Sequence, residues 1–176
     1  ESKTIHARNI SDGSETWKYQ LEFVPAGIAS DENRVVAIGK SGEIVCLSSI
    51  GGSLAWQDAL KNGAGASLPF DVRMSAGQLF VVKNGISSFR VSEGQWLWRY
   101  LPSPALPWKN QTKSLVWTDE KLLLSHNSGK QLEIPLANPI EASESSAGSA
   151  VSAKNQKDSS VFVFGWEIRL TDAGEV

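Results

Sequence analysis

Three stretches of the chain repeat one pattern: IHARNISDGSETWKYQL (Ile5–Leu21), IVCLSSIGGSLAWQDAL (Ile44–Leu60) and ISSFRVSEGQWLWRYLP (Ile86–Pro102). Each stretch begins with isoleucine, has a small residue two positions later, and carries a glycine four residues before a tryptophan. The successive tryptophans lie 39 and 42 residues apart. This period is typical of a four-stranded propeller blade and is longer than the repeat of a helical hairpin, which is about 34 residues.

The regular register of these glycines and tryptophans indicates a structural role. An indole buries roughly 200 Å² when it packs, so a tryptophan at the same place in every unit favours contacts between units over ligand binding. We therefore expect six residues to dock neighbouring units together: Gly13, Trp17, Gly52, Trp56, Gly94 and Trp98.

Short apolar runs separate the tryptophan stretches and come in pairs. The paired runs lie at residues 28–30 and 34–39, 72–75 and 78–83, and 115–118 and 121–125. They are rich in β-branched and aromatic residues and are bounded by turn residues, including Asn84-Gly85, a strong hairpin signal. We find no amphipathic helix, since Gly63 and Gly65 interrupt the best candidate. The sequence predicts an all-β fold, a β-propeller of four-stranded antiparallel blades.

The units do not all have the same completeness. Residues 1–136 should contain three to four blades, the first of which is incomplete because its third strand starts near Thr4. Residues 137–160 read as a flexible insertion, since Glu141–Ser160 is rich in Ser, Ala and charge. Residues 161–176 should hold a closing strand, Val161–Leu170, and a tail. That strand either completes the fourth blade or pairs with the first one, and we expect a partial propeller.

Composition excludes several classes of function. The formal net charge is −2 and the basic residues are scattered, so no nucleic-acid partner is expected. The longest apolar runs fall far short of the about 20 residues that a membrane span requires. His6 and His126 have no partner at metal-ligand spacing, and Cys46 should be a buried, unreactive thiol. We expect no cofactor and no metal.

The pattern small-x5-Gly-x3-Trp resembles the docking motif of the quinoprotein-type, or PQQ-like, propeller repeats over residues 4–136. That family often has Asp eight positions before the Trp, where this chain has Asn9, Ser48 and Arg90. Its enzymes use adjacent cysteines, an acidic base and calcium ligands. The lone Cys46 cannot supply the cysteine pair, so the resemblance implies a non-enzymatic member.

Short segments of the chain resemble two non-enzymatic branches of this family. Residues 49–56 and 92–102 look more like the large luminal propeller subunit of the endoplasmic reticulum membrane protein complex than like the periplasmic lipoprotein of the barrel assembly machine. Asn9 and Asn110 begin N-glycosylation sequons. We therefore expect the extracytoplasmic side of a membrane, with the endoplasmic reticulum lumen favoured over the periplasm.

One candidate binding element lies outside the repeat. Trp108 and Lys109 sit in the proline-rich link at residues 102–113, although a loop tryptophan can also fold back over a sheet. The sequence favours a non-catalytic interaction scaffold whose partners are other protein subunits of a membrane-associated assembly. Two alternatives stay open: a fragment of a quinoprotein-type dehydrogenase, and a propeller that binds carbohydrate or peptide.

Overall fold

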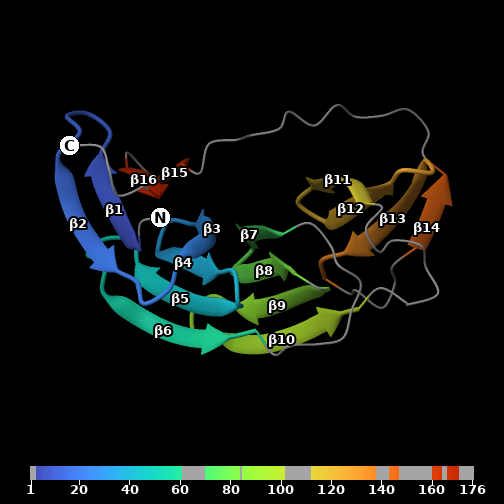
Figure 1. Cartoon of the computed structure of the whole chain (residues 1–176), viewed down its shortest axis with the longest axis horizontal. Coiled ribbons are helices and arrows are strands. Elements are labelled where there is room, and N and C mark those ends of the chain that lie inside the picture. The colour runs from blue at the N-terminus through green and yellow to red at the C-terminus, as the bar shows by residue number, and fades with distance from the viewer. Residues whose placement is uncertain are drawn as a thin grey trace.

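The computed structural model describes residues 3–60, 70–83, 85–101 and 112–137, and the strands at 143–146, 160–163 and 166–170. Its described residues form four antiparallel sheets of four strands each. We name these sheets blades 1 to 4, following the chain from the N-terminal strands. Figure 1 shows them as an open array with blades 1 and 4 at opposite ends. The predicted all-β fold of four-stranded antiparallel blades is confirmed, and the partial propeller fits this arrangement.

Blades 2 and 3 are each formed by a continuous piece of chain. Blade 2 contains β3 (Pro25–Ser30), β4 (Arg34–Gly39), β5 (Glu43–Ser48) and β6 (Leu54–Ala59). Blade 3 contains β7 (Asp71–Ser75), β8 (Gln78–Val82), β9 (Ile86–Arg90) and β10 (Gln95–Tyr100). In both, neighbouring strands are consecutive in sequence, so each blade is a simple meander joined by short turns.

The core lies between the blades, because the middle strands are buried on both faces. In β4, Val35 and Ala37 face a cluster shared with blade 1, whereas Val36 and Ile38 face a cluster shared with blade 3. Successive side chains of a strand point to opposite faces, so a continuous apolar run can fill two clusters at once. The same rule applies to β8, where the side chains of Phe80 and Val82 face the cluster shared with blade 4.

Blade 1 is built from both ends of the chain. Its strands are β15 (Ser160–Val163), β16 (Trp166–Leu170), β1 (Thr4–Asn9) and β2 (Glu15–Gln20). Of the two pairings that the sequence left open, the structure has the one with the first blade, since β16 pairs antiparallel with β1. The single strand expected at Val161–Leu170 is divided into β15 and β16, which pair with each other.

Blade 4 contains β11 (Thr112–Trp117), β12 (Lys121–His126), β13 (Lys130–Pro135) and β14 (Ser143–Ser146). The last strand corrects the predicted flexible insertion for these four residues, because β14 pairs with β13 as the outer strand of the blade. Its sequence, SESS, lacks the apolar alternation that identifies a strand, so backbone pairing alone defines it.

Candidate functional site

Three five-residue turns of similar geometry connect the two strands of the repeated hairpins. We call them docking turns: Asn9–Gly13, Ser48–Gly52 and Arg90–Gly94. In each, the glycine N–H donates to the carbonyl oxygen four residues earlier, at 2.8, 2.9 and 2.9 Å. The glycines have φ values of 72°, 66° and 71°, a left-handed conformation that side-chain-bearing residues rarely adopt.

Two of the docking turns hold an indole from the preceding blade. The Trp17 indole N–H donates to the Ser49 carbonyl oxygen at 2.8 Å, and a Cβ atom built on Gly52 would lie 2.5 Å from the Trp17 ring. Trp56 repeats this contact on blade 3, donating to the Val91 carbonyl oxygen at 2.7 Å and lying against Gly94. A ring can approach the backbone this closely only where the residue has no side chain.

The small residue of each repeat lies directly across the hairpin from its tryptophan. Ala7 pairs with Trp17, Cys46 with Trp56 and Ser88 with Trp98, and in each blade the register shifts beside this pair. A small side chain opposite the indole leaves room for the ring to turn towards the next blade.

The remaining members of the predicted docking set behave differently. No described atom lies within 4 Å of a Cβ built on Gly13. Trp98 is half-buried against blade 4, with its ring centroid 5.9 Å from that of Phe80. Any turn of blade 4 equivalent to the docking turns falls between β13 and β14, at residues that are not all described.

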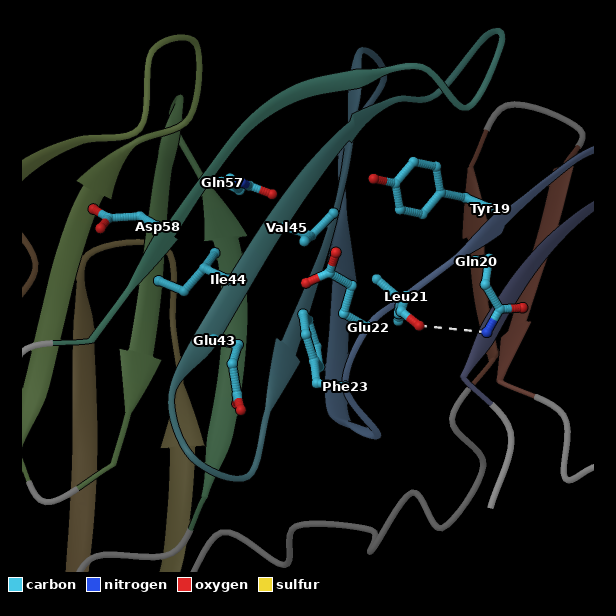
Figure 2. A pocket seen from close by; sticks show the side chains of 10 residues that line it. All are labelled: Tyr19, Gln20, Leu21, Glu22, Phe23, Glu43, Ile44, Val45, Gln57 and Asp58. Atoms are coloured by element: carbon cyan, nitrogen blue, oxygen red, sulfur yellow. Dashed lines mark hydrogen bonds between the residues drawn. The ribbon is translucent and has the colours of Figure 1, made fainter.

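A pocket of about 600 Å³ opens between blades 1 and 2. Figure 2 shows its lining, which comes from the end of β2, the link to β3, and the facing parts of β5 and β6. The lining residues are Tyr19, Gln20, Leu21, Glu22, Phe23, Glu43, Ile44, Val45, Gln57 and Asp58.

The pocket combines an apolar floor with acidic walls. Leu21 and Val45 are buried in the cluster shared by blades 1 and 2, whereas the buried Ile44 side chain faces blade 3. The carboxylates of Glu22 and Glu43 join Leu21 and Val45 in the lining, which contains no Lys or Arg. Asp58 pairs with Ile44 across the strands, so its carboxylate lies on the face towards blade 3. Such a surface suits a basic amphipathic segment, whose aliphatic part would cover the floor while its charge lies near the carboxylates.

The neighbouring polar contacts keep the acidic character of the pocket. Glu43 Oε2 accepts the Ser41 backbone N–H at 3.1 Å, and Asp58 Oδ1 accepts the Ala59 N–H at 2.7 Å. Lys3 lies beside the pocket, where its ammonium donates to the Glu22 carbonyl oxygen at 2.9 Å.

The titratable residues singled out from the sequence lie apart from the pocket. Cys46 is fully buried, and burial raises the pKa of its thiol from 9.0 to about 12. His6 Nδ1 contacts Glu15 Oε2 at 2.6 Å, and this hydrogen bond lowers the pKa of Glu15. His126 Nδ1 lies 2.5 Å from Ser128 Oγ. Within the described residues, no three His, Cys, Asp or Glu side chains are grouped to hold a metal ion.

The predicted binding and glycosylation residues are only partly described. Trp108, Lys109 and Asn110 lie outside the described residues. Asn9 ends β1 inside the first docking turn, where its Oδ1 accepts both the backbone N–H and the hydroxyl of Ser11. In the described part of the chain, no helix has the length and apolarity that crossing a bilayer requires.

Sequence reasoning missed the pocket and a polar link between blades 3 and 4. The Trp117 indole N–H donates to Asp71 Oδ2 at 2.6 Å, and Arg73 Nη2 lies 3.4 Å from Asp119 Oδ1. These partners are 46 residues apart and have no shared motif, so only the packing of the blades brings them together. The two pocket carboxylates, Glu22 and Glu43, likewise share no motif along the sequence.

The fold and the docking turns define a propeller repeat protein, and comparison with known proteins gives the family. The family model described as "Outer membrane protein assembly factor BamB" (PQQ_2) matches residues 1–157. The chain therefore belongs to this family of PQQ-like repeats. None of the curated proteins compared with the chain matches it.

Two solved structures resemble the chain in fold. The crystal structure of BamB from Moraxella catarrhalis is 22% identical with a TM-score of 0.54, covering 72% of this chain and 39% of that one. The crystal structure of HIRA(644-1017) is 13% identical with a TM-score of 0.51, covering 76% of this chain and 42% of the other. The chain thus spans about two fifths of the length of these structures.

Proposed function

We propose that the chain is a non-catalytic protein-interaction scaffold within a membrane-associated assembly that inserts or assembles membrane proteins. The observation that carries this proposal is the match of residues 1–157 to the family described as an outer membrane protein assembly factor. The acidic pocket between blades 1 and 2 supplies a surface for one contact, with a basic amphipathic segment of a partner subunit.

Charge on the pocket rim should set the strength of this contact. An exposed ion pair contributes about 0.5 kcal/mol, so the two pairs made by Glu22 and Glu43 contribute about 1 kcal/mol, or roughly fivefold in affinity. The attraction should weaken in salt, because charges are screened over about 10 Å at 0.1 M ionic strength.

Site-specific crosslinking tests the proposal. Tyr19 is replaced by the photocrosslinker p-benzoylphenylalanine, which keeps an aromatic group in the pocket, and the full chain is irradiated with an intact membrane fraction. We expect a salt-sensitive product that contains a subunit of a membrane-protein assembly complex, identified by mass spectrometry. Neutralising the pocket with Glu22→Gln and Glu43→Gln should reduce its yield about fivefold.

A matched variant controls for net charge. Glu32 and Glu120 are exposed carboxylates outside the pocket, and changing both to Gln alters the charge equally. The control should crosslink as the wild type does. Absence of any membrane-assembly subunit from the products, or equal loss in both double variants, would overturn the proposed role of the pocket.

The two other readings of the sequence predict different results. A quinoprotein-type dehydrogenase fragment would oxidise an alcohol when supplied with the quinone and calcium, and we expect no such activity. A carbohydrate- or peptide-binding propeller would lose its ligand on Trp108→Ala, and crosslinking from Trp108 and Lys109 would map that loop directly. We include this loop in the proposed interaction surface as a second contact.

The proposal places the chain on the extracytoplasmic side of a membrane, in line with the description of its family. Preference for the endoplasmic reticulum lumen over the periplasm rests on the likeness of residues 49–56 and 92–102 to the luminal propeller subunit and on the sequons at Asn9 and Asn110. Expression through a secretory pathway, followed by enzymatic removal of N-glycans, tests it by a mass shift. No shift at either asparagine would leave the luminal assignment without support.

A further inference from the structure

Three polar groups of the pocket between blades 1 and 2 have no hydrogen-bond or ion-pair partner within the part of the chain that the structure describes. They are the Tyr19 hydroxyl, the Glu22 carboxylate and the Gln57 side-chain amide. Lys3 binds the main-chain carbonyl of Glu22 and leaves its carboxylate open. Figure 2 shows the three groups directed towards the Val45 side chain. Each contains an oxygen that can accept a hydrogen bond, so the pocket presents three open acceptors.

The surface between these acceptors is apolar. Leu21 and Val45 are buried in one cluster, and the rings of Tyr19 and Phe23 pack against it. Phe23 also lies on Gly39, where a built Cβ atom would be 2.7 Å from its ring, so its position is fixed from below. A ligand that matches this pocket has an aliphatic stem and ends in a positively charged group that only donates hydrogen bonds. Among amino-acid side chains, those of lysine and arginine have this construction.

An ammonium group suits the three acceptors better than a guanidinium does. An ammonium carries three N–H donors that point in different directions. The acceptors likewise come from three elements, since Tyr19 lies in β2, Gln57 in β6 and Glu22 in the link that follows β2. A guanidinium is planar and pairs best with both oxygens of one carboxylate, an arrangement that makes no use of the other two acceptors. The arrangement therefore favours lysine.

We propose that the partner segment is anchored in this pocket by one lysine side chain. Its four-carbon stem lies over Leu21 and Val45, and its ammonium donates to the Tyr19 hydroxyl, the Glu22 carboxylate and the Gln57 amide oxygen. Glu43 adds a second negative charge to the lining. This inference rests on the proposed function, because it names the residue type through which the partner subunit binds.

Blocked single amino acids are the probes for this anchor. The lysine probe is Nα-acetyl-lysine N-methylamide, and it is compared with the corresponding compounds of arginine, norleucine and Nε-acetyl-lysine. Norleucine has the same four-carbon stem without the ammonium. Each compound is titrated into the full chain labelled with ¹⁵N. We expect the lysine compound to give saturable shifts of the backbone amides of residues 19–23 and 43–45, and the three other compounds to bind about fivefold more weakly.

Two conservative variants test the named acceptors. Glu22→Gln removes the charge and keeps the shape of the side chain, so it should weaken binding of the lysine compound about fivefold. Tyr19→Phe removes one acceptor and keeps the ring, so it should weaken binding about threefold. Glu120→Gln makes the same change of charge at an exposed residue of blade 4 and should bind as the wild type does. Thermal melting of all three variants should match that of the wild type.

Four results would overturn the lysine anchor. These are the absence of a saturable shift, shifts confined to residues outside the pocket, equal binding of the lysine compound and any of the other three, and equal binding by the wild type and Glu22→Gln. The comparison of the compounds uses the unaltered chain, so it holds even where a variant folds poorly.

Crosslinking from position 19 separates this inference from the proposed function. A crosslinked membrane-assembly subunit without a preference for lysine would remove the anchor alone. A preference for lysine without any such subunit would remove the proposed function and leave a lysine-binding pocket.

Discussion

The contact between Trp17 and Gly52 should couple the stability of blades 1 and 2, and a double-mutant cycle measures that coupling. Trp17 is 8% exposed, and Trp→Ala in a core costs about 3–5 kcal/mol. The variant also removes the donor to the Ser49 carbonyl oxygen, a buried acceptor worth about 1 kcal/mol or more. We expect Trp17→Ala to lower the free energy of unfolding by about 4–6 kcal/mol.

Gly52→Ala acts on the same contact from the other side. Its Cβ would lie 2.5 Å from the ring at a φ of 66°, so the variant suffers left-handed strain of about 1–2 kcal/mol and overpacking of about 1–3 kcal/mol. Without the Trp17 ring, only the strain is left. The two substitutions should therefore be non-additive by about 1–3 kcal/mol.

Urea denaturation of the full chain gives the four free energies of the cycle. The slope of unfolding against urea should stay constant, so that shifts of the midpoint report stability. Gly13→Ala is the matched control, because it has the same backbone conformation without a neighbouring ring and should cost only the strain. Additivity within about 0.5 kcal/mol would refute the docking role of this pair.

Three further predictions concern single residues. Burial raises the pKa of Cys46 from 9.0 to about 12, so folded protein at pH 8 should react with a thiol reagent no faster than it unfolds, and rapid labelling would contradict this. The free energy of unfolding should also fall above pH 9, because the Cys46 thiol then ionises in the unfolded state alone. The His6 contact lowers the pKa of Glu15, so its contribution to stability is present above pH 4.5 and is lost on acidification; Glu15→Gln should flatten this part of the pH profile, measured by thermal melting. Asp71→Ala leaves the Trp117 indole N–H without its acceptor and should lower the free energy of unfolding by about 1–3 kcal/mol, measured in urea. An unchanged unfolding midpoint would show that this hydrogen bond does not stabilise the fold.

The blade architecture could be predicted from the sequence because its signals are local. The spacing of glycine and tryptophan gives the period, and runs such as Arg34–Gly39 give strands that the structure confirms with the same bounds. The hairpin that carries Trp17 could also be predicted from one stretch of 17 residues, Ile5–Leu21. Local patterns of this kind specify strands and turns whatever the rest of the chain does.

Features that depend on distant residues could not be predicted in the same way. Glu22 and Glu43 line one pocket only after blades 1 and 2 pack together. The pairing of β16 with β1 was one of two open alternatives, because the sequence of a strand does not specify the strand with which it pairs. β14 was missed because backbone hydrogen bonds need no particular side chains.

The construction of blade 1 from both chain ends has a kinetic consequence. Ile5 pairs with Leu170, so this sheet needs contacts across almost the whole sequence, whereas blades 2 and 3 pair neighbours only. Closing so long a loop loses more chain entropy before any contact compensates for it, and non-local pairings form slowly. We expect blades 2 and 3 to fold early and β16 to join last. Until then β1 is an open edge, the place where a nascent chain is most exposed to wrong pairing.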